Sequence, residues 1–282
     1  MSSSSSLQPS KASRGISPFA PFQTFWLHRK LIFRLAGREL EARYRGSMLG
    51  AFWMVATPLL MLTVYTFVFT TIFQSRWGKA GGGSMEFASL LFSGLILFGV
   101  FSECVTRAPG VVLENVSYIK KVVFPLEILP LVGVVVSLVN AVLSFFILLM
   151  FYFPLFGIPP LTSFLLPFVL LPLILMTLGV SWFLASAGVY LRDLRQIVGL
   201  LVTLLMFLTP IFYPLEAVPK TVEAYIHFNP LTLIMEQSKD LLFWARLPDI
   251  TDWALSVIMS WGCAWLGYVW FMKTRKGFAD VV

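Results

Sequence analysis

The chain carries little charge for its length. Asp, Glu, Lys and Arg make up 12% of its 282 residues, whereas hydrophobic residues make up 58%. Soluble domains contain about 25% charged and about 45–50% apolar residues. A soluble fold of this length has too little interior to bury the excess. The sequence therefore predicts an all-α integral membrane protein, in which the bilayer takes the place of water around the helices.

Residues that commonly carry catalysis are also scarce. The only histidines are His28 and His227, and the two cysteines, Cys104 and Cys263, lie near or inside apolar stretches without paired spacing. This pattern indicates neither a disulfide framework nor a metal site. The sequence has no HExxH and no Gly-x-x-x-x-Gly-Lys-Ser/Thr motif, because the glycine-rich segment 78–84 has its lysine in the wrong place. We expect no catalytic residue, no metal and no cofactor in this chain.

The net charge of +7 would suggest a nucleic-acid partner if the protein were soluble. Here the cations lie in short loops and tails beside apolar segments, so we interpret them as determinants of topology and expect no nucleic-acid partner. Residues 1–21 are rich in Ser and Pro and lack the apolar core of a signal peptide. We predict a disordered cytoplasmic tail there.

Six apolar segments have a length suited to a membrane span, which requires about 17–25 residues. Together they define a six-span domain over 50–272, followed by a tail over 273–282. The segments are Gly50 to Phe73, Phe87 to Val105, Leu126 to Phe153, Leu161 to Tyr190, Ile197 to Tyr213, and Trp253 to Met272. With this division, sixteen of the 21 Lys and Arg residues fall on one side. Both termini are therefore expected in the cytoplasm.

The segment before the first span mixes aromatic residues with Arg29, Lys30, Arg34 and Arg38. This mixture predicts an amphipathic helix over 22–49 that lies in the membrane interface and contacts membrane lipids. A plain cationic anchor that only fixes the topology explains the same residues.

A specific motif joins this helix to the first span. The spacing Arg-Tyr-Arg-Gly-Ser-x-Leu-Gly-x-x-Trp runs from Arg43 to Trp53 and is followed by Pro58. It resembles the start of the first membrane helix in permease subunits of type-2 ABC exporters that move polysaccharides. The resemblance covers the chain from about Phe22 onward. It implies that the interface helix gates the cytoplasmic mouth and that Arg43, Tyr44 and Arg45 meet a charged, lipid-linked substrate.

The resemblance also implies an assembly. The permease would act as a homodimer in the bacterial inner membrane, and two separate ATPase subunits would bind ATP and Mg. The cargo would be a lipid-linked polysaccharide, with lipopolysaccharide O-antigen preferred over capsule or teichoic acid polymers and small lipophilic compounds. Two other classes remain open: a membrane glycosyl- or acyltransferase, which lacks a catalytic constellation here, and an ion-coupled carrier, which lacks mid-span charges and a repeat.

A polar segment over 107–121 lies between the second and third spans. After Pro109-Gly110, which we expect to break the preceding helix, Val111, Glu114, Asn115 and Tyr118 follow helical spacing and share one face. In the resembled family this segment is the coupling helix that docks into the ATPase. An ordinary amphipathic connector would show the same pattern.

Aromatic residues follow helical spacing along the first span and gather at the end of the fifth. These residues are Tyr65, Phe69 and Phe73, and then Phe207, Phe212 and Tyr213. Flat rings suit a sliding sugar polymer, so the resemblance favours a channel lined by them. Rings that face lipid or pack between helices are the alternative.

The segment 214–252 is too apolar for a free loop and predicts short periplasmic helices. It contains Asn229-Pro230-Leu-Thr and Lys239. In the resembled family this region forms an outer gate, and a basic residue often lies near the position of Lys239. Two acidic residues, Glu103 and Glu127, lie close to span ends, where a role at the interface is expected rather than a proton relay.

Overall fold

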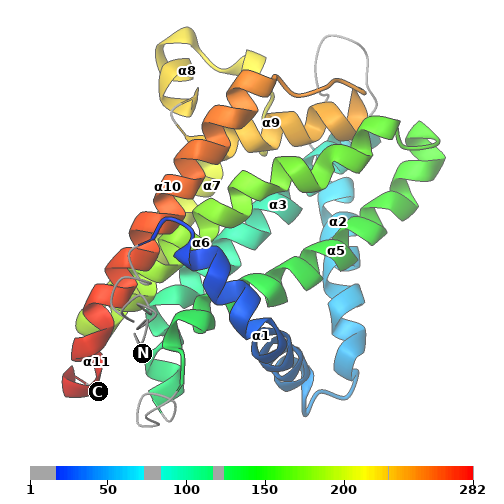
Figure 1. The fold of residues 1–282 in the computed structure, drawn as a ribbon. Coiled ribbons are helices and arrows are strands. Elements are labelled where there is room, and N and C mark those ends of the chain that lie inside the picture. Colours follow the sequence, from blue (N-terminus) through cyan, green and yellow to red (C-terminus); the bar gives the residue numbers. More distant parts are fainter. Residues whose placement is uncertain (1–16, 73–83, 117–123, 228, 282) are drawn as a thin grey trace, which may run out of the picture.

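The computed structural model describes residues 17–72, 84–116, 124–227 and 229–281. Within these ranges every regular element is a helix, and the helices form a single bundle (Figure 1). The predicted all-α fold is confirmed. Phe73 of the predicted channel stripe and Tyr118 of the predicted coupling segment lie outside the described residues.

Among the described residues, four helices are long and apolar enough to cross a membrane. They are α3 (Ser84–Val111), α5 (Leu129–Phe156), α6 (Leu166–Tyr190) and α10 (Ile250–Thr274). Two further apolar helices, α2 (Trp53–Phe67) and α7 (Leu194–Leu208), have 15 residues each, which is below the about 17–25 residues of a spanning helix. A helix is therefore present in each of the six predicted spans, and four of these helices have membrane length.

The two shorter helices end differently. Helical backbone continues on both sides of α2, as a 3₁₀ turn over Gly50–Phe52 and a π-helical turn over Val68–Ile72. In contrast, α7 stops at Leu208, before the predicted end of the fifth span at Tyr213. Pro210 and Pro214 follow it, and proline cannot continue a helix hydrogen-bond ladder.

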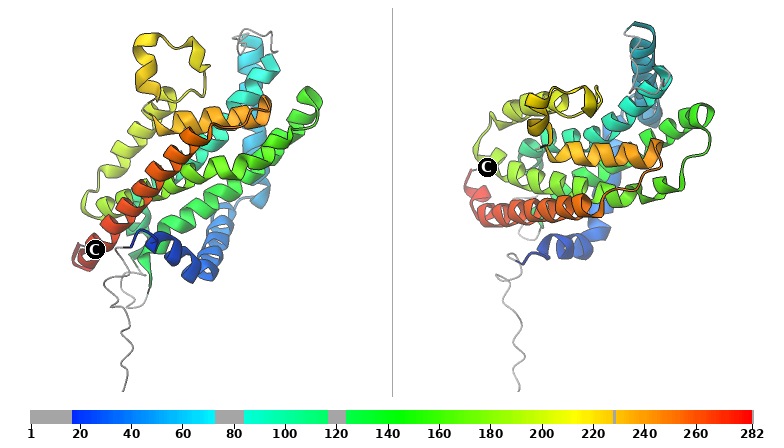
Figure 2. Two further views of the ribbon diagram at one scale, coloured as in Figure 1. Left: turned by 45° about the horizontal axis from the view of Figure 1, so that its top comes forward. Right: turned by 90° about the horizontal axis from the view of Figure 1, so that it is seen from above.

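Helices α6 and α10 pack along each other with their backbones in close contact (Figure 2). A Cβ atom added to Gly267 of α10 would lie 2.1 Å from the carbonyl oxygen of Gly179 in α6. Small residues allow membrane helices to approach this closely. Trp182 of α6 is fully buried nearby, and its indole N–H donates to the carbonyl of Glu127 at 2.9 Å. This contact ties α6 to the 3₁₀ turn over Leu126–Ile128 that precedes α5.

The N-terminal helix, α1 (Ala20–Tyr44), packs across α5 and reaches α10. Its buried residues, Ala20, Thr24, Ile32 and Ala36, are separated by multiples of four, so they form one narrow stripe. The hydroxyl groups of Thr24 and Tyr268 lie 2.7 Å apart and tie α1 to α10. The segment predicted over 22–49 is therefore helical as far as Tyr44, with exposed aromatic residues opposite its buried stripe.

The predicted helix break at Pro109-Gly110 is wrong, because α3 continues through both residues to Val111. Proline removes one helix hydrogen bond, but this turn packs tightly on α6. A Cβ atom added to Gly188 would lie 2.1 Å from the carbonyl oxygen of Pro109. Tertiary packing thus overrides the local preference. A 3₁₀ turn over Leu113–Asn115 comes after α3, and residues 117–121 of the coupling segment lie outside the described ranges.

Two short helices, α8 (Lys220–His227) and α9 (Pro230–Phe243), cover one end of the bundle, while α1 and α11 (Phe278–Val281) lie toward the other (Figures 1 and 2). The predicted segment 214–252 is therefore largely helical. It leads into α10 through a capping residue. The Asp249 carboxylate accepts the backbone N–H groups of Thr251 at 2.7 Å and Asp252 at 3.4 Å, and these bonds lower the pKa of Asp249 below its ordinary value.

Candidate functional site

The turn between α1 and α2 is shaped by the motif that runs from Arg43 to Trp53. Gly46 and Gly50 have φ angles of 87° and 49°. For a residue with a Cβ atom, this left-handed backbone conformation is unfavourable by roughly 1–2 kcal/mol. The Trp53 indole N–H donates to the hydroxyl of Ser47 at 2.9 Å and closes the turn. The glycine, serine and tryptophan positions of the motif therefore build an elbow that brings the end of α1 beside α2.

A cavity of about 460 Å³ lies beside this elbow, between the end of α1 and helices α2, α3 and α5. Arg43 and Tyr44 of the predicted gate line it, and so does Tyr65 of the predicted channel stripe. Arg45 is exposed and lies outside the cavity lining. The structure thus brings together two of the three predicted gate residues with one aromatic residue of the first span.

The cationic group in this cavity is held by an acid from another helix. Arg43 Nη2 lies 2.5 Å from a carboxylate oxygen of Glu103 in α3. The other oxygen of Glu103 accepts a hydrogen bond of 3.5 Å from the amide of Asn140 in α5. Side chains of three helices therefore meet at one point of the cavity. The Arg43 and Glu103 side chains are 30% and 27% exposed, so the pair remains accessible to a competing anion.

A polar stripe on α5 completes the cavity, and our sequence analysis missed it. Ser137, Asn140 and Ser144 all line the cavity. Their spacing of three and four residues places them on one helix face. Three polar residues at helical spacing inside a long apolar span were a signal that the sequence already contained. Polar side chains within a span usually face a cavity or another helix rather than lipid.

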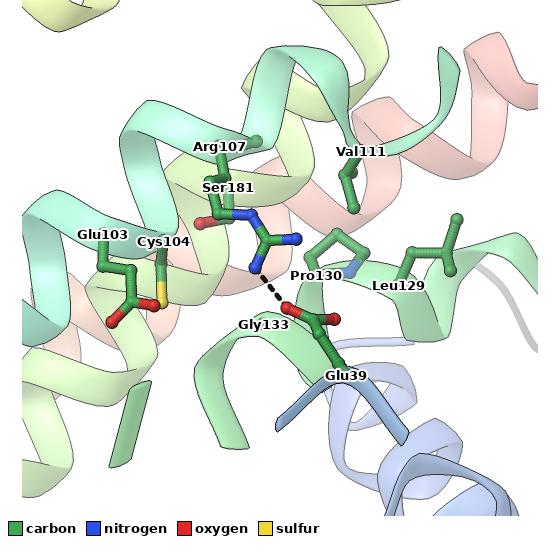
Figure 3. Close-up of a pocket in the computed structure, with 10 residues that line it drawn as sticks. Glu39, Glu103, Cys104, Arg107, Val111, Leu129, Pro130, Gly133 and Ser181 are labelled. Carbon is green, nitrogen blue, oxygen red and sulfur yellow. Dashed lines mark hydrogen bonds and ion pairs between the residues drawn. The ribbon is translucent and has the colours of Figure 1, made fainter. Parts of the chain in front are cut away.

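A second ion pair joins α1 and α3 one helical turn away. Arg107 donates to Glu39, and Figure 3 shows the two side chains pointing toward each other. Glu39 precedes Arg43 by four residues, and Arg107 follows Glu103 by four, so each helix presents one acid and one base on the same face. Each pair between partly exposed groups contributes about 0.2–1 kcal/mol. The two pairs therefore contribute more to the register of α1 against α3 than to the free energy of folding.

The Glu39–Arg107 pair borders a small pocket of about 20 Å³ (Figure 3). The pocket is also lined by Cys104 and Ser181, and the Ser181 hydroxyl is buried without a hydrogen-bond partner in the described part of the chain. A polar pocket of this size has room for about one water molecule. It is too small for a substrate.

Three predicted coupling residues, Val111, Glu114 and Asn115, line another cavity, of about 320 Å³, at the end of α3. Asn115 donates to the Val111 carbonyl at 2.8 Å. Glu114 pairs at 3.3 Å with Arg195 in the first turn of α7. The three residues thus share one surface, which the last turn of α3 and the following 3₁₀ turn provide.

The other channel residues that the structure describes, Phe69, Phe207, Phe212 and Tyr213, do not line the 460 Å³ cavity. Phe69 packs on Phe87 of α3, with ring centroids 5.2 Å apart. Phe207 and Phe212 stack at 5.7 Å, and the Tyr213 hydroxyl donates to the Phe207 carbonyl at 3.1 Å. These last three residues form a cluster at the end of α7, separate from Tyr65.

The predicted outer-gate residues hold α9 against the end of α7. Asn229 caps α9 by accepting the Leu231 N–H at 3.0 Å, and its amide donates to the Thr209 hydroxyl at 2.9 Å. Pro230 occupies the first turn of α9, where its missing N–H is harmless. The Lys239 side chain is 1% exposed and donates to the Pro210 carbonyl at 2.7 Å and to Glu236 at 2.9 Å. The motif and the lysine therefore have a clear structural role.

Residues that could bind a metal do not gather in the described part of the chain, where no group of three His, Cys, Asp or Glu side chains has suitable placement. The two cysteines are free thiols. The side chains that line the 460 Å³ cavity are instead suited to binding a ligand. It offers one guanidinium group, hydroxyl and amide groups and four aromatic rings, Tyr44, Trp53, Tyr65 and Phe92.

Comparison with known proteins adds independent information. Residues 30–243 match the sequence model of a family described as ABC-2 type transporter. The chain is 31% identical over 261 residues to the O-antigen export system permease protein RfbA of Myxococcus xanthus, covering 90% of this chain and 96% of that protein. It is 28% identical to the protein of the same name from Klebsiella pneumoniae, with coverage of 75% and 79%. The polysialic acid transport protein KpsM of Escherichia coli is 23% identical, with coverage of 72% and 77%.

Proposed function

The chain belongs to the ABC-2 type transporter family, and from this premise we propose that it is the membrane subunit of an ATP-driven exporter of a lipid-linked polysaccharide. The observation that carries the proposal is the cavity beside the elbow. It combines a guanidinium group that an anion can reach with aromatic rings and a polar stripe. A diphosphate-linked sugar presents oxygens that arginine grips in a bidentate manner, and sugar rings that pack on aromatic faces.

The preferred cargo is lipopolysaccharide O-antigen. Several relatives bear that name, and the polysialic acid transporter is a more distant match. A capsule or teichoic acid polymer is the second candidate, since the name of KpsM refers to a different glycan, polysialic acid. The shared chemistry of these cargoes is a negatively charged link to lipid followed by a sugar chain. Residues Arg43 and Tyr44 would engage the link, and Tyr65 the first sugars.

Two copies of this chain and two ATPase subunits would form the working exporter. Because this sequence has no phosphate-binding loop, ATP and Mg would be bound by the ATPase. The ATPase would dock on this chain at the 320 Å³ cavity that Val111, Glu114 and Asn115 line, at the same end of the bundle as α1. Both termini would be cytoplasmic, with all six apolar helices crossing the inner membrane. Helices α8 and α9 would form the outer gate on the periplasmic side.

The test is reconstitution. We expect proteoliposomes that contain this chain and the ATPase to move a lipid-linked polysaccharide only when ATP is present. Vesicles with this chain alone, or with an ATPase whose phosphate-binding lysine is replaced, serve as controls. Modification of the glycan by the chain alone, without ATP, would instead favour a membrane transferase. Uptake driven by an ion gradient alone would favour a secondary carrier.

A further inference from the structure

A second, larger groove lies on a different face of α5 from the polar stripe. It has a volume of about 640 Å³, and its lining comes from α1, α5, α6 and α10. Every lining side chain is apolar or aromatic. The volume falls in the range of about 300–1,000 Å³ that is typical of sites for small molecules. The groove shares no lining residue with the cavity beside the elbow.

The shape of the groove follows one leaflet of a bilayer. On α5 its lining runs along a single face from Leu131 to Leu143. At 1.5 Å per residue this stripe is about 18 Å long. Half of a hydrocarbon core of about 30 Å is about 15 Å. The groove therefore matches the length of a lipid chain that enters from the side of α1 and extends toward the bilayer centre.

A cationic residue lies on α1 beside the groove. Phe25 and Phe33 of α1 line it, and Arg29 lies midway between them, four residues from each and so on the same helix face. The Arg29 guanidinium stacks over Trp26 at 4.7 Å and donates to the Trp26 carbonyl at 2.7 Å. In the described part of the chain, no carboxylate forms an ion pair with Arg29, with the neighbouring Lys30 or with Arg34.

We propose that this groove is a binding site for one acyl chain of an anionic phospholipid, whose phosphate contacts Arg29. An apolar groove of leaflet length beside an unpaired, aromatic-stacked guanidinium group suits a lipid with a negatively charged headgroup. The bound lipid would fill the space between α1 and helices α5, α6 and α10 and stabilise their packing. The inference rests on the membrane placement of α1 in the proposed function, but not on the identity of the cargo or on ATP-driven transport.

The experiment compares two probes in native mass spectrometry of the purified protein: phosphatidylglycerol and phosphatidylcholine with identical acyl chains. We expect the wild-type chain to retain phosphatidylglycerol about tenfold more strongly, because a charge-assisted contact adds affinity. Arg29→Gln should remove this preference. Arg34→Gln is the matched control, since five residues place Arg34 about 140° around the helix from Arg29. A wild-type protein that retains both lipids equally overturns the proposal.

A pair of leucine variants tests the groove itself. Leu171 lines the groove and is 39% exposed, whereas Leu266 of α10 is 63% exposed and lies outside it. We expect Leu171→Trp to reduce retention of both lipids at least severalfold and Leu266→Trp to leave it unchanged. Equal retention in the two variants, or copurification of an isoprenoid lipid in place of phospholipid, contradicts the proposal. Because the readout needs no transport, its failure leaves the exporter function standing, and a failed transport assay leaves the lipid site standing.

Discussion

Arg43 in the last turn of α1 and Glu103 in α3 form an ion pair of 2.5 Å at the cavity beside the elbow. The pair joins residues 60 positions apart in the sequence. It neutralises the cation that we propose as the contact for a lipid-linked phosphate. A substrate whose negatively charged link binds Arg43 would therefore compete with Glu103 for the same guanidinium group, and its arrival would leave the Glu39–Arg107 ion pair to join α1 to α3.

The first prediction concerns this competition. We expect Arg43→Lys to reduce export about tenfold, because lysine cannot reproduce bidentate phosphate binding and a loss of about 1.4 kcal/mol is a factor of ten. Arg45→Lys is the matched control, since Arg45 lies outside the cavity lining and should keep most of the activity. Surface polysaccharide, normalised to permease in the membrane, is the measurement. Equal export by the two variants would return Arg43 to the role of a topology anchor.

The second prediction separates the aromatic residues of the first span. In a background without Cys104 and Cys263, we expect cysteine at position 65 to react with a water-soluble thiol reagent, because Tyr65 lines the cavity. Cysteine at position 69 should react far more slowly, because Phe69 packs on Phe87. An engaged polymer should protect position 65. Lack of labelling there in an actively exporting complex would remove Tyr65 from the substrate path.

The third prediction tests the ATPase-docking surface. We expect Glu114→Ala to leave the permease folded, since its exposed pair with Arg195 contributes at most about 1 kcal/mol. The same change should weaken copurification with the ATPase and lower the stimulated ATPase rate. Glu86→Ala, at the other end of α3, is the control. Indistinguishable copurification of the two variants would argue against docking at this surface.

The fourth prediction concerns the contact between α6 and α10. Gly267→Ala should severely reduce the amount of folded protein, because its Cβ atom would lie 2.1 Å from the Gly179 carbonyl oxygen. Overpacking of this kind costs typically about 1–3 kcal/mol or more. Gly262→Ala, in the same helix with no atom within 4 Å of its Cβ position, should be neutral or stabilising. Thermal unfolding in detergent measures both, and similar midpoints would disprove the close contact.

Local features of this protein were determined by the sequence itself. Apolar runs predicted the helices, because a span must satisfy its backbone hydrogen bonds within the segment. The motif from Arg43 to Trp53 marked the junction of the interface helix with the first span, although no turn was predicted there; the elbow itself depends on two glycines and a serine–tryptophan hydrogen bond within a few residues. Asn229-Pro230 marked the start of α9 for the same reason. Each of these signals depends only on neighbours along the chain.

Contacts between helices were decided by the tertiary structure. Nothing local in the sequence pairs Arg43 with Glu103 or buries Lys239 against the Pro210 carbonyl. The helix continues through Pro109 because α6 packs against it, contrary to the local preference. Tyr65 and Phe69 lie four residues apart, yet Tyr65 lines the cavity and Phe69 packs on Phe87. The rotation and crossing of whole helices select these partners, and that choice depends on the summed packing of residues far apart in the sequence.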